Sequence, residues 1–422
     1  MPQINKVVII GAGPAGLAAA LRLHDINNIS VTIYEIREQP THLGGAINIP
    51  ANGLRLIDRL GVYESLLKGG SIIPQLVVHS INGNELGRLD YIAKIKAKTG
   101  YEFIRIKRTV VVDALLSEVQ NRGIPIHFNK SLVAVDENAK TGATITFSDG
   151  SSDTADLLLG CDGIHSAVRK LHVDPKIRPE YSGVSSMSSI VPMPTELAGM
   201  HTTFTSQGSV VVVPCAENSQ EKSLFWFLTR HIPEPDTADK RDGWNEHREK
   251  EVAGFKNTLE EVTSEVGGDW GSFLRAVVSK TDTVNFYPIY RLPHGGVWHT
   301  SRCVLIGDAA HAMQPHVGQG VSMALEDVFL LSRLLKKESS LQESLRQFET
   351  VRRPRIEEFA SQAANNGNRA RQKGPWQMAI TEWGMWAWFR ARRVFSSWSW
   401  GFREEEWTYD IDRVDIDYFD AL

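Results

Sequence analysis

The first 35 residues alternate between short apolar runs and a glycine-rich turn. Residues 6–10 have the sequence KVVII, and such a nearly continuous apolar run is typical of a strand buried on both faces of a parallel sheet. Residues 11–16, GAGPAG, interrupt the run, and residues 17–26 carry apolar side chains at helical spacing. A second apolar run, ISVTIYE, follows at 29–35. This order predicts a strand, a turn, a helix and a second strand, which together make a βαβ unit.

The rest of the chain continues to mix strand and helix patterns. Residues 72–104 contain alternating segments around an Asn82-Gly83 turn and predict an antiparallel hairpin. Short strands dominate residues 180–290, where we expect a mostly antiparallel sheet. The further predictions are a helix at 109–120, strands at 124–128, 132–135, 144–147, 209–213, 223–228 and 303–306, a helix at 322–336, and helical segments from residue 341 onward that are interrupted at Pro354 and near Gly374-Pro375.

Length and composition narrow the class of protein. A chain of 422 residues exceeds what one hydrophobic core usually supports, so we expect two closely joined domains. The net charge of -4 argues against a general nucleic-acid-binding protein. Cys161, Cys215 and Cys303 form no CxxC pair, which excludes a dithiol redox motif and a thiolate zinc site. Neither a leader peptide nor an apolar run of membrane-spanning length is recognised, so a cytoplasmic location is expected.

Three glycines in the first turn have the spacing of a dinucleotide-binding motif. Gly11 permits the tight turn, Gly13 lets the backbone approach a pyrophosphate, and Gly16 lets the helix pack closely on the strand. The positive end of the helix then faces the phosphates. Glu35 ends the second strand, where a carboxylate can accept hydrogen bonds from both ribose hydroxyls. The motif predicts a bound dinucleotide but does not distinguish FAD from NAD.

Two further segments separate these cofactors. Residues 160–169 have the sequence GCDGIHSAVR, and residues 307–327 have the sequence GDAAHAMQPHVGQGVSMALED. With the glycine motif, and in this order, they resemble the single-component FAD-dependent aromatic hydroxylases, the class A flavin monooxygenases. Salicylate-hydroxylase-like members and members from fungal secondary metabolism are the most similar. The resemblance covers residues 4–60, 105–170 and 285–350.

The resemblance implies an α/β fold with two domains and a helical tail. The first is a doubly wound FAD-binding (Rossmann-type) domain, and the second is a mostly antiparallel β-sheet substrate domain. The expected boundaries are 1–75, 105–178 and 285–345 for the discontinuous FAD-binding domain, 76–104 and 179–284 for the substrate domain, and 346–422 for the C-terminal helices.

The resemblance also assigns residues to FAD. Asp308 matches the aspartate that contacts the ribitol or pyrophosphate part, and Arg108 matches an FAD-contacting arginine, although Lys107 and Val110 beside it depart from the family's His-Arg-x-Asp/Glu pattern. A helix that begins near Val321 would aim its positive end at the flavin and stabilise the anionic reduced form. The expected cofactor-binding residues are Gly11, Gly13, Ala15, Gly16, Glu35, Gly45, Ala46, Arg108, Asp162, Asp308, Pro315, Gly318, Gly320, Val321 and Ser322, with Gln319 in the same loop.

The chemistry that the resemblance implies is oxygenation. FAD is the expected cofactor, and NADH or NADPH is the expected transient co-substrate because no second GxGxxG appears in a βαβ context. The implied reaction uses NAD(P)H and O2 to hydroxylate or epoxidise an aromatic or polycyclic small molecule through a flavin C4a-hydroperoxide in a dry pocket. The alternatives are a prenyl-lipid-type flavin reductase, a non-catalytic prenyl or GTPase escort-like protein, and a flavin halogenase, whose WxWxIP segment this chain lacks.

Candidate substrate-contacting residues come from the middle sheet. Phe225 and Phe227 share one face of their strand, with Trp226 on the other, and Tyr287 belongs to a later strand. Arg230 could bind a substrate anion, and an ordinary salt bridge is its alternative.

Two residues of the glycine-containing loop are candidates for catalysis, namely Pro315 and His316. His165 and His311 are expected to be structural histidines. No metal site is predicted.

The C-terminal segment is rich in tryptophan, with arginines interleaved. We expect these aromatic side chains to form a helical cap over the FAD domain, because an aromatic stripe usually buries itself. A lid or a membrane-touching surface is the alternative. The remaining expected partners are the aromatic substrate and O2, without nucleic acid, in a monomer or homodimer. The tryptophans are Trp376, Trp383, Trp386, Trp388, Trp398, Trp400 and Trp407.

Overall fold

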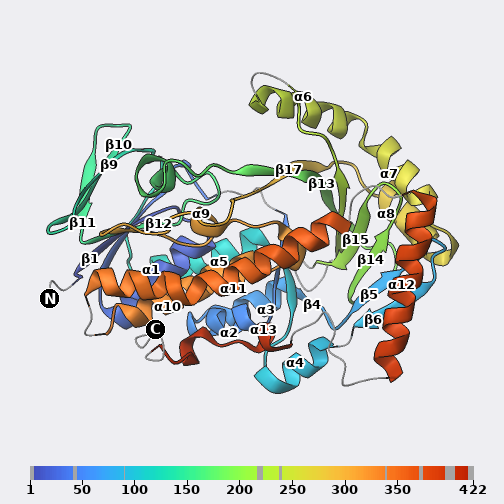
Figure 1. The fold of residues 1–422 in the computed structure, drawn as a ribbon, viewed down its shortest axis with the longest axis horizontal. Coiled ribbons are helices and arrows are strands. Elements are labelled where there is room, and N and C mark those ends of the chain that lie inside the picture. Colours follow the sequence, from blue (N-terminus) through green and yellow to red (C-terminus); the bar gives the residue numbers. More distant parts are fainter. Residues whose placement is uncertain are drawn as a thin grey trace.

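The computed structural model contains two sheet regions that lie next to each other, with helices packed around both (Figure 1). One region is built around a parallel sheet and the other around a seven-stranded sheet. A long helix, α11 (Leu341–Arg369), extends along the molecule past the first region (Figure 1). The residues that the structure describes are 4–40, 45–89, 91–215, 222–236, 240–337, 340–369, 374–394 and 404–416.

The parallel sheet has five strands, and every neighbouring pair in it is parallel. The central strand β1 follows from its sequence, because Val7, Val8 and Ile9 form a continuous apolar run and are completely buried. Helix α1 (Pro14–Asn27) packs against both α5 (Arg108–Asn121) and α10 (Gly320–Leu334). This arrangement confirms the prediction of an α/β domain with a Rossmann-like parallel sheet. In spatial order the strands are β18 (Cys303–Leu305), β12 (Leu157–Gly160), β1 (Lys6–Ile10), β2 (Ser30–Tyr34) and β8 (Ile126–His127).

Two small antiparallel sheets extend this region. One has the order β11-β10-β9 and the other has the order β3-β7-β4. The second is important for the site, because β7 buries Ile104 and Ile106 in the core of the parallel-sheet domain. The strands are β3 (Ala46–Ile49), β4 (Gly70–Ile72), β7 (Ile104–Lys107), β9 (Leu132–Asn138), β10 (Gly142–Phe147) and β11 (Ser152–Ala155), and the short helices of this region are α2 (Ala51–Arg59), α3 (Tyr63–Gly69), α4 (Tyr91–Thr99), η1 (Arg169–Val173), α9 (Asp308–His311) and η2 (Pro315–Val317).

The seven-stranded sheet is antiparallel except between β14 and β5. Its β5–β6 pair is the antiparallel hairpin that the sequence predicts. Strand β17, which begins at residue 285, pairs with β13 in this sheet. The strands are β17 (Asn285–Arg291), β13 (Glu180–Pro192), β16 (Ser223–His231), β15 (Ser209–Pro214), β14 (Met200–Phe204), β5 (Leu76–His79) and β6 (Glu85–Leu89).

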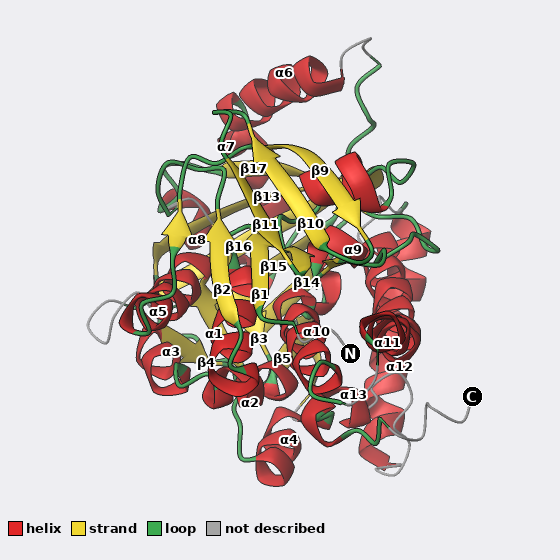
Figure 2. Cartoon of the chain, turned by 90° about the vertical axis from the view of Figure 1, so that its left-hand side faces the viewer, coloured by secondary structure: helices red, strands yellow, loops and turns green. Residues whose placement is uncertain are grey.

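Helices cover one face of the seven-stranded sheet (Figure 2). The prediction that strands dominate residues 180–290 was wrong between residues 240 and 279, which form α6 (Lys240–Ala253), α7 (Phe255–Ser264) and α8 (Gly268–Ser279). Phe255, Leu259 and Val262 have helical spacing, and they pack with Trp226 in one core. Trp226 therefore faces α7 and α8, whereas Phe225 belongs to a different core on the opposite face.

The C-terminal helices differ from the expectation at one point. Helix α11 passes through Pro354 without a break, although a proline inside a helix costs about 3 kcal/mol. Burial of Phe348 and Phe359 in the core of the parallel-sheet domain holds both halves of the helix in line. The predicted interruption at Gly374-Pro375 is confirmed, because α12 (Pro375–Val394) begins there. The chain then forms α13 (Glu404–Thr408) and η3 (Ile411–Arg413).

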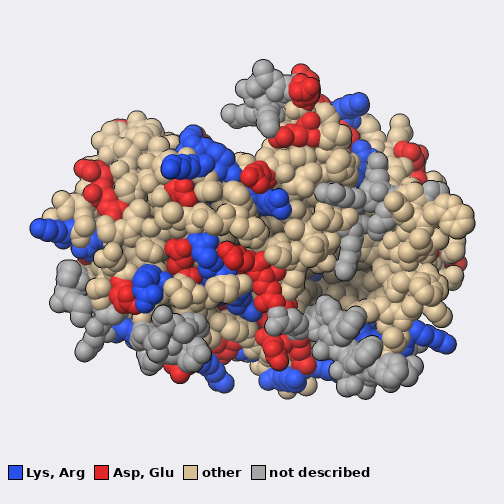
Figure 3. Space-filling view, viewed as in Figure 1, with Lys and Arg blue, Asp and Glu red and all other residues tan. Residues whose placement is uncertain are grey.

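The tryptophan-rich helix α12 does not form the expected cap over the parallel-sheet domain. It packs on β6, where Phe389 fills the space above Gly87. Trp376, Trp383 and Trp386 lie on the other side of the helix and are 84%, 69% and 47% exposed. The surface over α12 carries few charged residues in Figure 3.

Trp388 and Trp407 are half-buried, and Trp407 packs against Tyr91 and Phe103. Trp398 and Trp400 lie outside the described residues. Among the described helices, none combines the length and the apolar character needed to cross a membrane.

Candidate functional site

The glycine turn after β1 has the geometry that its sequence predicts. Gly11 has a φ of +106°, and a Cβ there would lie 2.5 Å from the carbonyl oxygen of Cys161. A Cβ on Gly16 would lie 1.9 Å from the carbonyl oxygen of Gly11, so only glycine allows α1 to start so close to β1. Gly13 is different, because its added Cβ would meet only the Arg108 guanidinium, at 4.0 Å. The turn therefore leaves one open backbone face at the N-terminus of α1.

The carboxylate of Glu35 closes the other side of this turn. Its Oε2 accepts a hydrogen bond from the backbone N–H of Ala12 at 2.8 Å, and its Oε1 accepts one from the backbone N–H of Arg37 at 3.0 Å. Oε1 also accepts a hydrogen bond from Nη1 of Arg37 at 3.4 Å, so Oε2 is the oxygen with a lone pair left for a further donor. The residue is buried at the end of the second strand, where the predicted ribose contact requires it.

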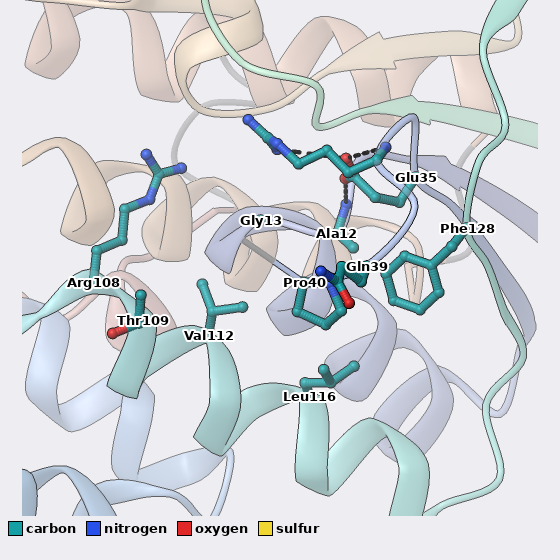
Figure 4. A pocket seen from close by; sticks show the side chains of 11 residues that line it. Ala12, Gly13, Glu35, Gln39, Pro40, Arg108, Thr109, Val112, Leu116 and Phe128 are labelled. Carbon is teal, nitrogen blue, oxygen red and sulfur yellow. Dashed lines mark hydrogen bonds and ion pairs between the residues drawn. The ribbon is translucent and has the colours of Figure 1, made fainter. Parts of the chain in front are cut away.

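A pocket opens between this turn and α5 (Figure 4). Arg108 lies at one end and Phe128 at the other, and Thr109, Val112 and Leu116 project from α5. Apolar walls of this kind suit an aromatic base, and the exposed helix N-terminus with a nearby arginine suits phosphate. The pocket therefore fits the nucleotide half of a dinucleotide. The lining residues are Ala12, Gly13, Glu35, Arg37, Gln39, Pro40, Arg108, Thr109, Val112, Leu116 and Phe128.

Asp308 and Asp162 come from two neighbouring strands and lie beside the same turn. Asp308 is exposed directly after Gly307, and its carboxylate has no hydrogen-bond partner among the described residues. Asp162 accepts hydrogen bonds at Oδ2 from the backbone N–H groups of Ala167, at 2.6 Å, and Val168, at 3.2 Å. Its Oδ1 is buried with no partner in the part of the chain that the structure describes, and burial raises the pKa of this carboxyl above its usual value.

The segment at 315–322 supplies a second helix N-terminus. Gly318 has a φ of +64° and lies against Asn48 of β3, since a Cβ on Gly318 would be 3.0 Å from the Asn48 amide nitrogen. Helix α10 begins at Gly320, one residue before Val321, as predicted. Gln319 Nε2 and Ser322 Oγ are buried and have no hydrogen-bond partner among the described residues. Unsatisfied buried polar atoms and free helix N–H groups at one place indicate a binding site for a polar ligand.

The segment at Gly45 and Ala46 connects these parts. The backbone N–H of Arg108 donates to the carbonyl of Gly45 at 3.1 Å, and a Cβ on Gly45 would lie 3.6 Å from the ring of Phe225. Ala46 follows in β3 and is buried. Ala15 lies in the first turn of α1 beside Gly307. The structure thus brings three separated parts of the chain together, and these residues fit FAD.

The predicted substrate residues have different surroundings. Phe225 is buried and lies 5.8 Å from the ring of Phe227, centroid to centroid, on the face of the sheet that is not covered by α7 and α8. Arg230 donates to both carboxylate oxygens of Glu251, at 2.9 and 3.0 Å, which is the ordinary salt bridge that we gave as its alternative. Tyr287 is 44% exposed.

The two candidate catalytic residues also differ. Pro315 is exposed at the start of η2. His316 turns its ring toward α11, where Nδ1 lies 3.0 Å from Gln314 Oε1 and a Cβ on Gly367 would lie 2.9 Å away. Burial lowers the pKa of His316 to about 4, so the ring is neutral at pH 7. The imidazole contacts Gln314 of the same loop through Nδ1, whereas its Nε2 is buried with no hydrogen-bond partner among the described residues.

A buried ionic network that the sequence did not reveal supports the site. Asp327 accepts hydrogen bonds at Oδ2 from the Gly307 backbone N–H at 2.9 Å and from His311 at 2.7 Å, and at Oδ1 from Arg352 at 2.7 Å. Interactions with His311 and Arg352 lower the pKa of Asp327, outweighing the opposing effect of burial. Neighbouring Glu326 accepts from Asn52 and Arg352. His311 is therefore structural, as expected, but nothing local in the sequence pairs Arg352 with Asp327.

Comparison with known proteins agrees with this geometry. Residues 5–270 and 296–363 match the family model described as "FAD binding domain". The chain belongs to this family of FAD-dependent monooxygenases. The protein is 26% identical over 355 residues to 6-hydroxynicotinate 3-monooxygenase of Pseudomonas fluorescens, with 80% of this chain and 84% of that protein covered. It is 28% identical over 361 residues to the FAD-dependent monooxygenase ausM of Penicillium brasilianum, with 80% and 70% covered.

A solved structure shows the same fold. The crystal structure of Klebsiella pneumoniae HpxO complexed with FAD and uric acid superposes with a TM-score of 0.78 at 21% sequence identity, covering 93% of this chain and 95% of that one. The monooxygenase fold of this protein, with its FAD-binding domain and its second, mostly antiparallel sheet, is the one that the sequence predicts.

Proposed function

We propose that this monooxygenase uses NAD(P)H and O2 to hydroxylate or epoxidise an aromatic small molecule at the boundary between its two sheets. The observation that carries the proposal is the series of contacts that links the 11–16 turn, the segment at 45–48 and the 315–322 loop: Arg108 lies beside Gly13, and its backbone N–H donates to the carbonyl of Gly45. The loop at Gly318 touches Asn48, and the neighbouring Gly45 touches Phe225 of the seven-stranded sheet. A flavin that spans this site would meet a substrate held against Phe225 and Phe227.

Different residues would bind different parts of FAD. Glu35 would accept hydrogen bonds from the ribose hydroxyls. Gly13 and Arg108 would bind the pyrophosphate at the N-terminus of α1. Asp308 would bind the middle of the cofactor. The N-terminus of α10, at Gly320 and Val321, would stabilise negative charge on the flavin ring. When bound, FAD supplies the redox chemistry, taking a hydride from NAD(P)H and activating oxygen.

The protein's own contribution to the chemistry is positioning and exclusion of water. Phe225 and Phe227 provide an apolar wall, and a dry pocket protects reactive oxygen species from wasteful decay. The relatives act on hydroxynicotinate and urate by name, which are electron-rich rings with polar substituents. We expect the substrate here to be an electron-rich aromatic ring. The oligomeric state, monomer or homodimer, and the cytoplasmic location stay predictions.

The test is a panel of aromatic compounds added to the purified protein loaded with FAD. The expected result is that at least one compound stimulates NAD(P)H oxidation, with matched oxygen consumption and an oxygenated product detected by mass spectrometry. Stimulated oxidation without oxygen uptake would favour a flavin reductase. A protein that takes up no FAD would contradict the proposal altogether.

A further inference from the structure

A buried arginine lies at the boundary between the two sheets without a carboxylate partner. Arg105 is 6% exposed. Its Nη1 donates to Asn48 Oδ1 at 2.9 Å, and its guanidinium carbon lies 4.4 Å above the centre of the Phe225 ring. Its Nε is buried and has no hydrogen-bond partner among the described residues.

The charge of Arg105 is therefore incompletely compensated. No aspartate or glutamate in the described part of the chain forms an ion pair with it. Burial lowers its pKa to about 10, so the guanidinium still carries its positive charge at pH 7. By contrast, the equally buried Arg352 has two carboxylate partners, Glu326 and Asp327. A buried cation is costly when its described neighbours, here the Asn48 amide, the Phe225 ring and the Cys215 thiol, supply no carboxylate, which points to a ligand that brings the missing negative charge.

The position of Arg105 identifies the site of this ligand. On β7 its neighbours Ile104 and Ile106 point into the core of the parallel-sheet domain, so Arg105 lies on the opposite face, against Phe225. Its partner Asn48 also touches the loop at Gly318. Arg105 is thus linked to the proposed flavin loop on one side and to the substrate sheet on the other.

We propose that Arg105 anchors a carboxylate on the aromatic substrate of this enzyme. Asn48 occupies Nη1, which leaves the edge formed by Nε and Nη2 for the two parallel hydrogen bonds that a carboxylate accepts from a guanidinium. Stacking on Phe225 holds the plane of the guanidinium in place. The inference rests on the proposed function and narrows its substrate class to aromatic acids. It replaces Arg230, which Glu251 already neutralises.

The test compares acids with their neutral amides. FAD-loaded wild-type protein is titrated with benzoate against benzamide, salicylate against salicylamide, and indole-3-acetate against indole-3-acetamide, and binding is measured by calorimetry and by the change in flavin absorbance. We expect at least one acid to bind about 10- to 100-fold more tightly than its amide, the range expected for charge-assisted hydrogen bonds. Equal binding of acid and amide in every pair, or no binding of any acid, would overturn the proposal.

Two variants then assign the preference to Arg105. Arg105→Met keeps the length of the side chain but removes the charge, and it should abolish the preference for the acid while amide binding changes little. Arg105→Lys keeps the charge without the planar fork and should retain part of the preference. Arg88→Met, which removes an exposed arginine paired with Glu85, is the matched control and should behave as wild type. An unchanged preference in Arg105→Met would show that the residue only joins the two sheets.

These experiments distinguish a failure of the Arg105 anchor from a failure of the proposed oxygenation. FAD retention and the melting temperature are measured for each variant, so a folding defect is recognised, and Arg105→Lys then carries the comparison. If acids bind through Arg105 but no compound couples NAD(P)H oxidation to oxygen uptake, the proposed oxygenation fails and the anchor stands. If aromatic acids are bound and oxygenated equally well by wild type and Arg105→Met, the anchor fails and the oxygenation stands.

Discussion

The carboxylate of Asp327 accepts a hydrogen bond from the backbone N–H of Gly307 at a distance of 2.9 Å. Gly307 has a φ of +61° and packs so closely on α10 that an added Cβ would lie 2.8 Å from the Cβ of Ala324. Asp308, the proposed FAD contact, follows directly. Because Arg352 of α11 binds the same carboxylate, a helix far along the chain helps to hold this turn in place.

We predict that Asp327→Asn destabilises the protein and weakens FAD binding. The amide keeps the shape of the side chain but leaves the fully buried Arg352 with Glu326 as its one remaining carboxylate partner among the described residues. Breaking a buried pair in this way costs about 3 kcal/mol of unfolding free energy. Urea unfolding of the apoprotein and titration with FAD measure the two effects.

Glu343→Gln is the matched control, because it breaks the exposed pair with Arg346. Exposed pairs contribute at most about 1 kcal/mol, so its unfolding curve should lie near that of wild type. Equal unfolding curves for Asp327→Asn and Glu343→Gln would contradict the role that we give to the network.

Replacing Asp308 separates cofactor binding from stability. Asp308 is exposed and has no partner among the described residues, so Asp308→Ala should change the unfolding free energy of the apoprotein by no more than about 0.5 kcal/mol. The purified variant should nevertheless be largely free of flavin. The ratio of flavin to protein absorbance after purification checks this, and full retention of FAD would refute the assigned contact.

Two glycines of the first turn should respond differently to alanine. A Cβ on Gly16 would overlap the carbonyl oxygen of Gly11, so Gly16→Ala should unfold at a much lower temperature or fail to fold. A Cβ on Gly13 meets nothing closer than 4.0 Å, so Gly13→Ala should keep its stability and lose FAD affinity. Thermal unfolding of the two apoproteins and an FAD titration of Gly13→Ala distinguish these outcomes. A stable Gly16→Ala would mean that the turn is looser than described.

Stability at acid pH should depend on Glu137. Burial opposes its ionisation, but hydrogen bonds from Ser301, Thr300 and His172 outweigh that effect and lower the pKa of the carboxyl to about 2. Because its pKa is lower in the folded protein, the ionised carboxylate stabilises the fold at pH values above the ordinary pKa of glutamate. This stabilisation is lost as the pH falls toward 2. Glu137→Gln should therefore destabilise the protein at pH 7 by about 1 to 3 kcal/mol, and the difference from wild type should shrink below pH 4.5. Urea midpoints measured between pH 7 and pH 3 give the comparison, and a constant difference would contradict it.

The sequence by itself determined those parts of the protein whose physics is local. The spacing of Gly11, Gly13 and Gly16 predicts the phosphate turn because each glycine answers a steric demand within a few residues of itself. The apolar run of β1, the carboxylate of Glu35 at the end of β2 and the start of α10 near Val321 follow from the same short-range rules.

Only the tertiary structure decided the features that depend on contacts between distant segments. Pro354 was expected to interrupt a helix, and packing on the parallel-sheet domain overrides that preference. Trp376, Trp383 and Trp386 of α12 were expected to be buried, and they face solvent because Phe389 forms the contact with β6. Nothing in the local sequence of its strand distinguishes Arg105. Its role as a ligand-binding candidate follows only from the contacts with Asn48 of β3 and Phe225 of β16. A local pattern reports which face of an element is apolar, but the partner that covers that face is set by the whole fold.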